Sequence, residues 1–325
     1  MLVNELREVI KKYNDREKDK IIVELYKRIP KKIKENYEID NYIINLEQNL
    51  ESKPKKEEYI SFEQLEKEVE YFLMCAENDW YASPNKIIPK KERSKWRFKV
   101  KKYYKELTSI DPNTEDGRKA TELLRQIFEI LSLGTHYLKF SNWDTFKAIQ
   151  ISQPDFFEII VKRKLMEGFS KQNIAYCVDL LDVEKDPYII FEDLLSVFIS
   201  NLKTNDMKYI AIELIEEKIE AYYIKLQTLK KEKRKTYYVI ESINDFTKAA
   251  FYIYLGLYET ETGIKFYHKY YIETDQEVKE YILLEILDEF NLDSIWIDEY
   301  EKKLGKIDYR DTLKEEYINK KSKNK

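Results

Sequence analysis

The chain has 325 residues, of which 36% are charged and 43% hydrophobic, and a net charge of −4 at neutral pH. It can bury a sizeable core in one or two domains, and this balance excludes a polyanion, a general nucleic-acid binder and wholesale disorder. Only six glycines and seven prolines occur. Since glycine supplies the positive-φ corners of hairpins and tight loops, we expect long helices joined by short connections.

The first residues favour a cytoplasmic protein without membrane contact. The N-terminus, MLVNELREVIKK, acquires charges within five residues and holds no apolar core typical of a signal peptide. No apolar run is long enough to span a bilayer. Cys75 and Cys177 each lie inside an apolar helical pattern, which predicts two buried, reduced thiols.

Residues 1–50 are predicted to form an N-terminal helical segment. One helix begins near Asn4, a second begins at Asp15 and ends before Pro30, and a third begins at Asp40. In the first helix, we expect the apolar residues Leu6, Val9, Ile10 and Tyr13 to face inward. The first two helices have the size of a small nucleic-acid-binding hairpin, but two packed helices that open a larger fold are the simpler interpretation.

A linker is predicted at residues 51–58, ESKPKKEE, which contain a proline and no apolar residue. Ser61 and Gln64 then form a capping-box pattern ahead of a helix that ends near Trp80. Its apolar stripe consists of Phe62, Leu65, Val69, Phe72, Leu73 and Ala76. Its acids are Glu63, Glu66, Glu68, Glu70, Glu77 and Asp79, against a single Lys67.

The stretch Lys86–Lys105 is the most one-sided in charge, with ten basic residues and one acid, Glu92. We predict one helix that begins at Pro89, because proline suits a first helical turn. Trp96, Val100, Tyr103 and Leu107 recur at helical spacing and should be buried. The candidate partner-binding patch on this helix is Lys91, Arg93, Lys95, Arg97, Lys99, Lys101 and Lys102.

Two interpretations of this patch remain open. The preferred one pairs the basic helix with the acidic helix before it, so that the two edges neutralise each other. The other leaves the lysines free to meet an acidic partner or a phosphate backbone. The test is whether Lys95, Lys99 and Lys102 face the acids of Glu63–Asp79.

The remainder of the chain is predicted to be a series of helices. A central apolar helix begins at Thr114 or Asp116 and ends with Gly134 as a C′ cap. A short helix with Trp143 and Phe146 follows. The later helices are expected to open at Ser152, at Ser170, at Asp186-Pro187 and at Asn205, and then to span 243–258, 263–271, 275–290 and 294–304. The basic run 230–235, KKEKRK, complements a helix C-terminus.

These starts recur every 15 to 25 residues from about residue 152. The rhythm predicts an all-α fold of stacked helical hairpins, α-solenoid-like or an irregular bundle, with no significant β-sheet. We assign residues 59–310 to the main helical domain and 311–325 to a polar, basic tail that frays.

The sequence carries no recognisable catalytic, cofactor or metal motif. His136 and His268 lie far apart, and neither has a glutamate three residues before it. HExxH and CxxC are absent, and the six glycines are too dispersed for a phosphate-binding loop or a dinucleotide fingerprint. We therefore expect no enzyme, no catalytic, cofactor-binding or metal residues and no cofactor, and we interpret His136 as a capping or packing residue.

Two functions fit these observations. The first is a non-enzymatic scaffold that binds a protein or peptide on a helical-repeat surface. The alternative is a nucleic-acid-associated protein that uses the stretch Lys86–Lys105, assisted by the N-terminal hairpin and by Lys230–Lys235.

Overall fold

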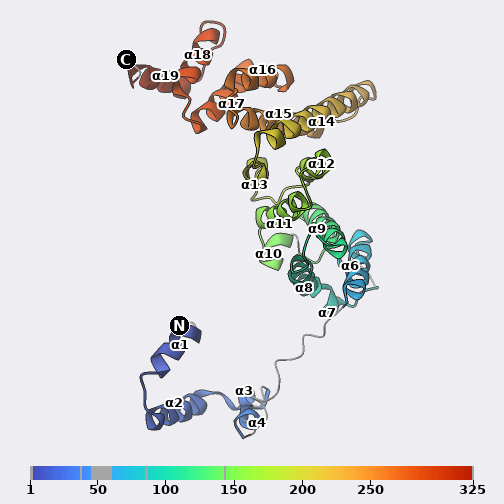
Figure 1. Ribbon diagram of the computed structural model, residues 1–325, viewed down its shortest axis with the longest axis vertical. Helices are drawn as coiled ribbons and strands as arrows, with labels where there is room; N and C mark the ends of the chain where they lie inside the picture. Colours follow the sequence, from blue (N-terminus) through green and yellow to red (C-terminus); the bar gives the residue numbers. More distant parts are fainter. Residues whose placement is uncertain (1–2, 37–38, 45–60, 85–86, 143, 324–325) are drawn as a thin grey trace. The chain divides into compact units, whose positions relative to one another are not determined.

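The computed structural model describes residues 3–36, 39–44, 61–84, 87–142 and 144–323, and this part of the chain is all-α (Figure 1). An isolated bridge between Leu304 and Ile307 is the non-helical pairing found there. The predicted fold class is confirmed. The chain divides into two compact units, Met1–Ser61 and Phe62–Lys325. The predicted linker 51–58 lies outside the described residues, as do Lys86 and Trp143.

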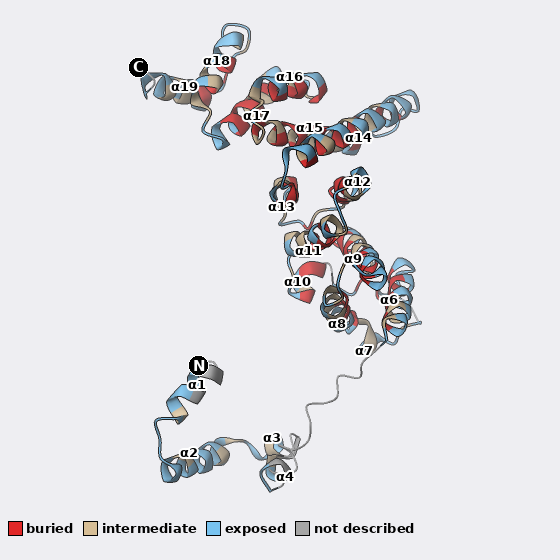
Figure 2. Ribbon diagram, viewed as in Figure 1, coloured by how far each residue is buried: buried red, intermediate tan, exposed pale blue. Residues whose placement is uncertain are grey.

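The first unit contains α1 (Val3–Ile10), α2 (Asp15–Arg28), α3 (Lys31–Asn36) and α4 (Ile39–Ile44). Asn14 opens α2 with a capping box, because its side chain accepts from the Glu17 amide and the Glu17 carboxylate accepts from the Asn14 amide. Leu6 and Val9 are exposed, and α2 buries none of its residues (Figure 2). The prediction that Leu6 and Val9 face inward is therefore wrong among the described residues of this unit.

The second unit is a longer succession of helices. They are α6 (Phe62–Glu77), α7 (Lys90–Arg93), α8 (Trp96–Thr108), α9 (Glu115–Leu133), α10 (Thr145–Ile149), α11 (Gln153–Met166), α12 (Lys171–Leu180), α13 (Phe191–Asn201), α14 (Asn205–Lys231), α15 (Tyr237–Leu255), α16 (Thr260–Tyr270), α17 (Gln276–Glu289), α18 (Asp293–Lys303) and α19 (Asp311–Lys323).

Hydroxyl caps set several of these starts. The side chains of Thr114, Ser152, Ser170 and Thr204 each accept a hydrogen bond from the backbone amide three residues on, which satisfies a donor that the helix cannot. The helix start predicted at Asp186-Pro187, in contrast, is wrong. The Asp186 carboxylate accepts from the Tyr188 amide at 3.1 Å, and this turn delays α13 until Phe191.

The helices pack both on their chain neighbours and on helices two places along. α9, α11, α13 and α15 contact one another in succession, while α12 packs on α14. α14, α15 and α16 also pack in sequence order. The red buried stripes in Figure 2 mark where these helices meet.

α9 is the central helix of the N-terminal part of this unit, because α6, α8, α10 and α11 all pack on it. Gly134 is the C-cap residue of α9, with φ near −66°, so the C′ position predicted for it is wrong. A Cβ at Gly134 would lie 2.8 Å from the Thr145 side chain and 2.9 Å from that of Phe140. Close packing against these two residues therefore explains the glycine.

The C-terminal residues form a packed helix, so the fraying tail expected over 311–325 is wrong for α19. Leu313 is buried, and the Tyr300 ring stacks on Tyr309 at 4.2 Å and on Tyr317 at 4.5 Å. Lys320 pairs with Asp293 at 2.6 Å. A sequence dominated by charge still docks here because Leu313 and Tyr317, four residues apart, lie on one helix face and pack against the core.

Candidate functional site

The basic stretch forms two helices, α7 and α8, where one had been predicted. Pro89 precedes α7 in an extended conformation, with ψ near 141°, and serves as its N-cap. The Lys95 amide then donates to the Glu92 carbonyl at 3.0 Å, three residues back. A bond of this tighter type marks the break between the two helices.

The inner face of α8 is as predicted. Trp96, Val100, Tyr103 and Leu107 are all buried. The Trp96 ring lies 4.3 Å from the Phe140 ring, which makes Trp96 an anchor for the helix.

One flank of α8 faces α6. Lys102 Nζ lies 3.0 Å from the Glu68 carboxylate, and the Tyr103 hydroxyl donates to the Glu68 carbonyl. Lys95, however, pairs with Glu92 at 2.9 Å. Lys99 lies 6.0 Å above the Tyr81 ring. The predicted neutralisation of the patch by the acidic helix therefore holds for Lys102 alone among the three lysines named for the test.

Other acids of the preceding segment have different partners. Glu63 pairs with Lys67 within α6, and Asp79 pairs with Lys139. Neither Lys67 nor Lys139 belongs to α7 or α8. Among the described residues, the opposite charges of the two segments therefore meet in the Lys102–Glu68 ion pair and not along their whole length.

The opposite flank of α8 meets α10. A hollow of about 470 Å³ opens there, lined by Arg97, Phe98, Lys101, Asn142, Asp144, Lys147, Ala148 and Gln150. The Arg97 guanidinium lies 4.9 Å from the centre of the Phe98 ring, and Phe98 is 58% exposed. Lys101 donates to the neutral Gln150 side chain at 2.5 Å.

A second hollow of about 370 Å³ adjoins the first. It is lined by Asp144, Phe146, Lys147, Gln150, Ile151, Ser152, Gln153, Asp186, Tyr188 and Ile189. Asp144, Lys147 and Gln150 line both hollows. We call the combined feature the α8–α10 surface, with Arg97, Phe98, Lys101 and Lys147 at its basic part and Phe146, Tyr188 and Ile189 at its apolar part.

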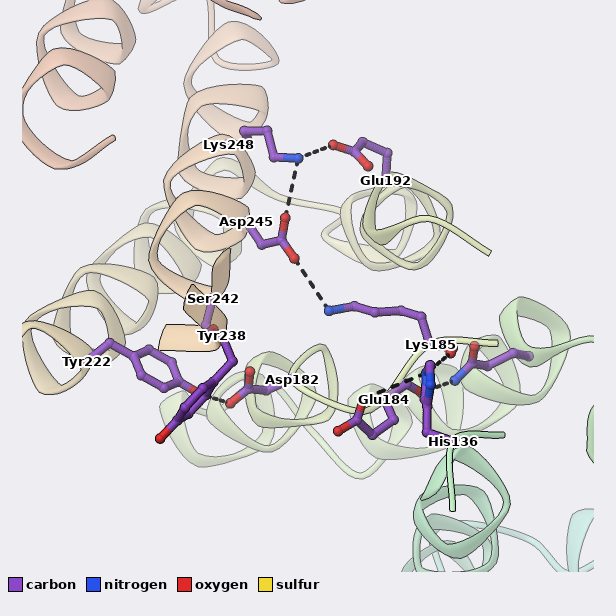
Figure 3. Close-up of polar contacts among 11 residues, drawn as sticks. His136, Asp182, Glu184, Lys185, Glu192, Tyr222, Tyr238, Ser242, Asp245 and Lys248 are labelled. Carbon is purple, nitrogen blue, oxygen red and sulfur yellow. Dashed lines mark hydrogen bonds and ion pairs between the residues drawn. The ribbon is translucent and has the colours of Figure 1, made fainter. Parts of the chain in front are cut away.

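The loop that carries Tyr188 and Ile189 is held by hydrogen bonds to its backbone. The buried Gln153 side chain donates to the Glu184 carbonyl at 2.8 Å and accepts from the Asp186 amide at 2.7 Å. The His136 ring nitrogen Nε2 lies 2.8 Å from the Lys185 carbonyl (Figure 3). His136 thus contacts the loop backbone, in keeping with a packing role.

The Lys185 side chain ties the same loop to α13 and α15. Its ammonium lies 3.4 Å from Asp245, which lies 3.3 Å from Lys248, and Lys248 lies 2.5 Å from Glu192 (Figure 3). Burial alone would lower the pKa of Lys248, but the two carboxylates outweigh it and the pKa is raised. Two cations and two carboxylates in alternation indicate a structural junction.

A further polar cluster lies near a hollow of about 500 Å³ lined in part by His268, Glu299 and Lys303. The buried Glu280 carboxylate lies 3.7 Å from Lys303 and 3.9 Å from His268. Burial raises the pKa of Glu280 and lowers that of His268. Both distances are too long for hydrogen bonds, and Glu280 does not line the hollow. We therefore propose no catalytic or binding role for this cluster.

No protein-family model, curated protein or solved structure matches this chain. Within the described ranges no helix is long and apolar enough to cross a membrane, and no group of three His, Cys, Asp or Glu side chains is placed to hold a metal ion.

Sequence reasoning named Arg97 and Lys101 but missed Lys147, Tyr188 and Ile189. Lys147 is a single lysine on a helix of five residues, without a pattern around it. The two residues after Pro187 were assigned to a helix, which gave no reason to expect a loop there. The Asp186-Pro187 dipeptide was the local signal from which a loop at these residues could have been predicted.

Proposed function

We propose that this chain is a non-enzymatic interaction protein, a helical scaffold that binds a segment of another protein at the α8–α10 surface. The observation that carries the proposal is that a basic hollow and an apolar hollow adjoin and share Asp144, Lys147 and Gln150. An apolar hollow supplies the anchor of a binding site, and charged groups beside it fix orientation and register.

The packing of the second unit supports a scaffold of helical-repeat type. Helices two places apart along the chain contact one another through α9, α11, α13 and α15. In such architectures each pair covers its neighbour's apolar face, and the exposed rows present an extended binding surface.

The attachment of the 184–189 loop supports a surface formed before the partner arrives. Gln153 holds the loop backbone on one side and the Lys185–Asp245 contact holds it on the other. A loop fixed in this way loses little conformational freedom on binding, so less of the binding free energy is spent on ordering it.

Nucleic acid fits this surface less well. Arg97 and Lys101 suit phosphates and Phe98 suits a stacked base. The adjoining apolar hollow, however, offers a phosphate backbone no partner, and the Asp144 carboxylate at the boundary repels it. We therefore favour a protein partner and treat nucleic acid as an outcome of the test.

The test is site-specific photocrosslinking in the native cell with a benzophenone amino acid in place of Phe98 or Tyr188. The control position is Tyr258, which is 95% exposed and belongs to neither hollow. We expect the same protein adduct from both surface positions, absent from the control and lost when Arg97→Glu is added. Adducts that nuclease removes, or no adduct beyond the control, would overturn the proposal.

A further inference from the structure

We infer that the segment bound at the α8–α10 surface is an acidic peptide with a large apolar side chain next to its acids. The inference rests on the proposed function and names the chemistry of the partner. Carboxylates of the peptide would lie against Arg97, Lys101 and Lys147. Its apolar side chain would enter the hollow beside Tyr188 and Ile189.

The basic part of the surface carries charge that the described part of the chain does not neutralise. Arg97 contacts the Phe98 ring, Lys101 donates to a neutral amide, and Lys147 is exposed. No ion pair is found for any of these three cations among the described residues. Asp144 is the acid in the same lining, so three positive charges face one negative charge. Complementary charge on the ligand is the direct consequence.

The contrast with neighbouring lysines on the same stretch sharpens this point. Lys95 and Lys102 hold carboxylates at 2.9 and 3.0 Å. Binding an acidic ligand there would first require these ion pairs to break. Arg97 and Lys147 have no such ion pair among the described residues, so no contact of this kind has to break before a carboxylate binds there.

The apolar part determines the second feature of the ligand. Phe146 is buried beneath the hollow, while Tyr188 is 80% exposed at its edge. The exposed Tyr188 ring and the adjoining apolar hollow form a continuous apolar surface that a large apolar side chain of the ligand would cover. Since Lys147 and Gln150 line both hollows, the apolar side chain and the acids of the ligand must be close neighbours in its sequence.

Asp144 favours a peptide over other polyanions. Its carboxylate makes no cap hydrogen bond to α10 and lines both hollows. A peptide backbone N–H can donate to this carboxylate between the acidic and apolar contacts. A phosphodiester backbone has no such donor and carries a charge that the carboxylate repels.

The experiment measures the fluorescence anisotropy of labelled probes with the full chain at low ionic strength. The probe is a short peptide with a run of glutamates next to Trp-Leu, made in both orders. Matched probes replace the glutamates by lysines, replace Trp-Leu by Ser-Ser, or consist of oligothymidine of equal length. We expect the acidic apolar peptide to bind in at least one order, and both peptide substitutions and oligothymidine to bind at least about tenfold more weakly.

Two variants locate the binding. Arg97→Glu with Lys101→Glu should weaken the acidic peptide at least about tenfold, and Tyr188→Ser should weaken the Trp-Leu peptide but not the Ser-Ser probe. The charge-reversal control is Lys162→Glu, an exposed lysine of α11 paired within its own helix, and it should leave binding unchanged. Circular dichroism of each variant checks that the helices remain.

The inference is overturned if the lysine probe binds as tightly, if oligothymidine binds more tightly than either peptide, or if the control weakens binding as much as the surface variants. No binding by any peptide, with protein adducts still formed from Phe98 and Tyr188, would reject this ligand chemistry and leave the scaffold function standing. Loss of those adducts as well would reject both.

Discussion

Replacing Arg163 should lower the free energy of unfolding, because this side chain links the end of α8 to the start of α9. Its guanidinium is buried in α11 and donates to the carbonyls of Thr108, Ile110 and Gly117 at 3.2, 2.8 and 3.1 Å. A fourth bond reaches the Thr121 hydroxyl at 3.1 Å. One side chain thus satisfies acceptors at the end of α8 and the start of α9.

The size of the effect follows from opposing terms. Arg163→Met leaves acceptors in a buried region without donors, and a bond from a charged donor contributes about 1.5–3 kcal/mol. Removing the cation also removes its desolvation penalty, since burial lowers the pKa of Arg163. The net loss in the free energy of unfolding should be about 3–5 kcal/mol, because several buried acceptors lose their donor at about 1–3 kcal/mol each and the removed desolvation penalty offsets part of this cost.

Arg163→Lys is the more informative substitution. It keeps the charge but loses the planar fork that reaches several acceptors at once. We expect it to be at least as destabilising as Arg163→Met, because the ammonium stays buried with fewer partners.

Urea unfolding followed by far-UV circular dichroism measures these changes, and an unchanged m-value shows that the compared states are the same. The matched control is Arg118→Met. Arg118 is exposed and makes a single long contact of 3.4 Å to the Asn113 carbonyl, so its loss should fall within about 0.5 kcal/mol. An Arg163→Met variant as stable as this control, or an Arg163→Lys variant as stable as the original chain, would refute the reasoning.

Three further predictions concern other parts of the second unit. Gly117→Ala would place a Cβ 1.8 Å from the Asp111 carbonyl oxygen and should cost at least about 3 kcal/mol in urea unfolding. In Gly256→Ala the new Cβ meets nothing closer than 3.5 Å, so this variant should be neutral or stabilised by up to about 1 kcal/mol. Equal losses in the free energy of unfolding for the two variants would contradict the close contact described at Gly117. Burial raises the pKa of the Cys177 thiol to about 12, so a thiol reagent should label it only upon unfolding, and rapid native labelling would disprove its burial. Hydrogen bonds from Arg310, at 2.7 Å to each carboxylate oxygen, lower the pKa of Glu277 below its ordinary 4.5. This pair therefore stabilises the fold above about pH 4.5 and loses its effect as the pH falls through the lowered value; a double-mutant cycle should give about 1 kcal/mol at neutral pH, shrinking in acid, and a constant coupling would contradict the sign.

Local patterns predicted the helices and the buried stripe of α8 because their causes lie within a few residues. A threonine hydroxyl at 114 or a serine hydroxyl at 152 caps its helix through an amide three residues away. The spacing of Trp96 and Val100 likewise places both on one face whatever lies opposite. Such features need no knowledge of the neighbouring helices.

The candidate surface could not be predicted in the same way, because its parts come from distant segments. Gln153 fixes a loop more than thirty residues later in the chain. The docking of α19 also depends on Leu313 meeting a core that includes Trp296 and Tyr300. Charge patterns alone suggested a tail there, since they do not reveal which apolar residues have a partner.

The basic stretch shows why counting charges along a sequence misassigns a surface. Helical periodicity divides α8 into a flank with Lys102 and a flank with Arg97 and Lys101, and each flank acquires different neighbours. On the first flank, Lys102 forms an ion pair with Glu68. On the second, α10 contributes another cation, Lys147, and a neutral glutamine. One flank of α8 is therefore engaged by an ion pair within the protein, and the proposed binding uses the other flank, whose cations form no ion pair among the described residues.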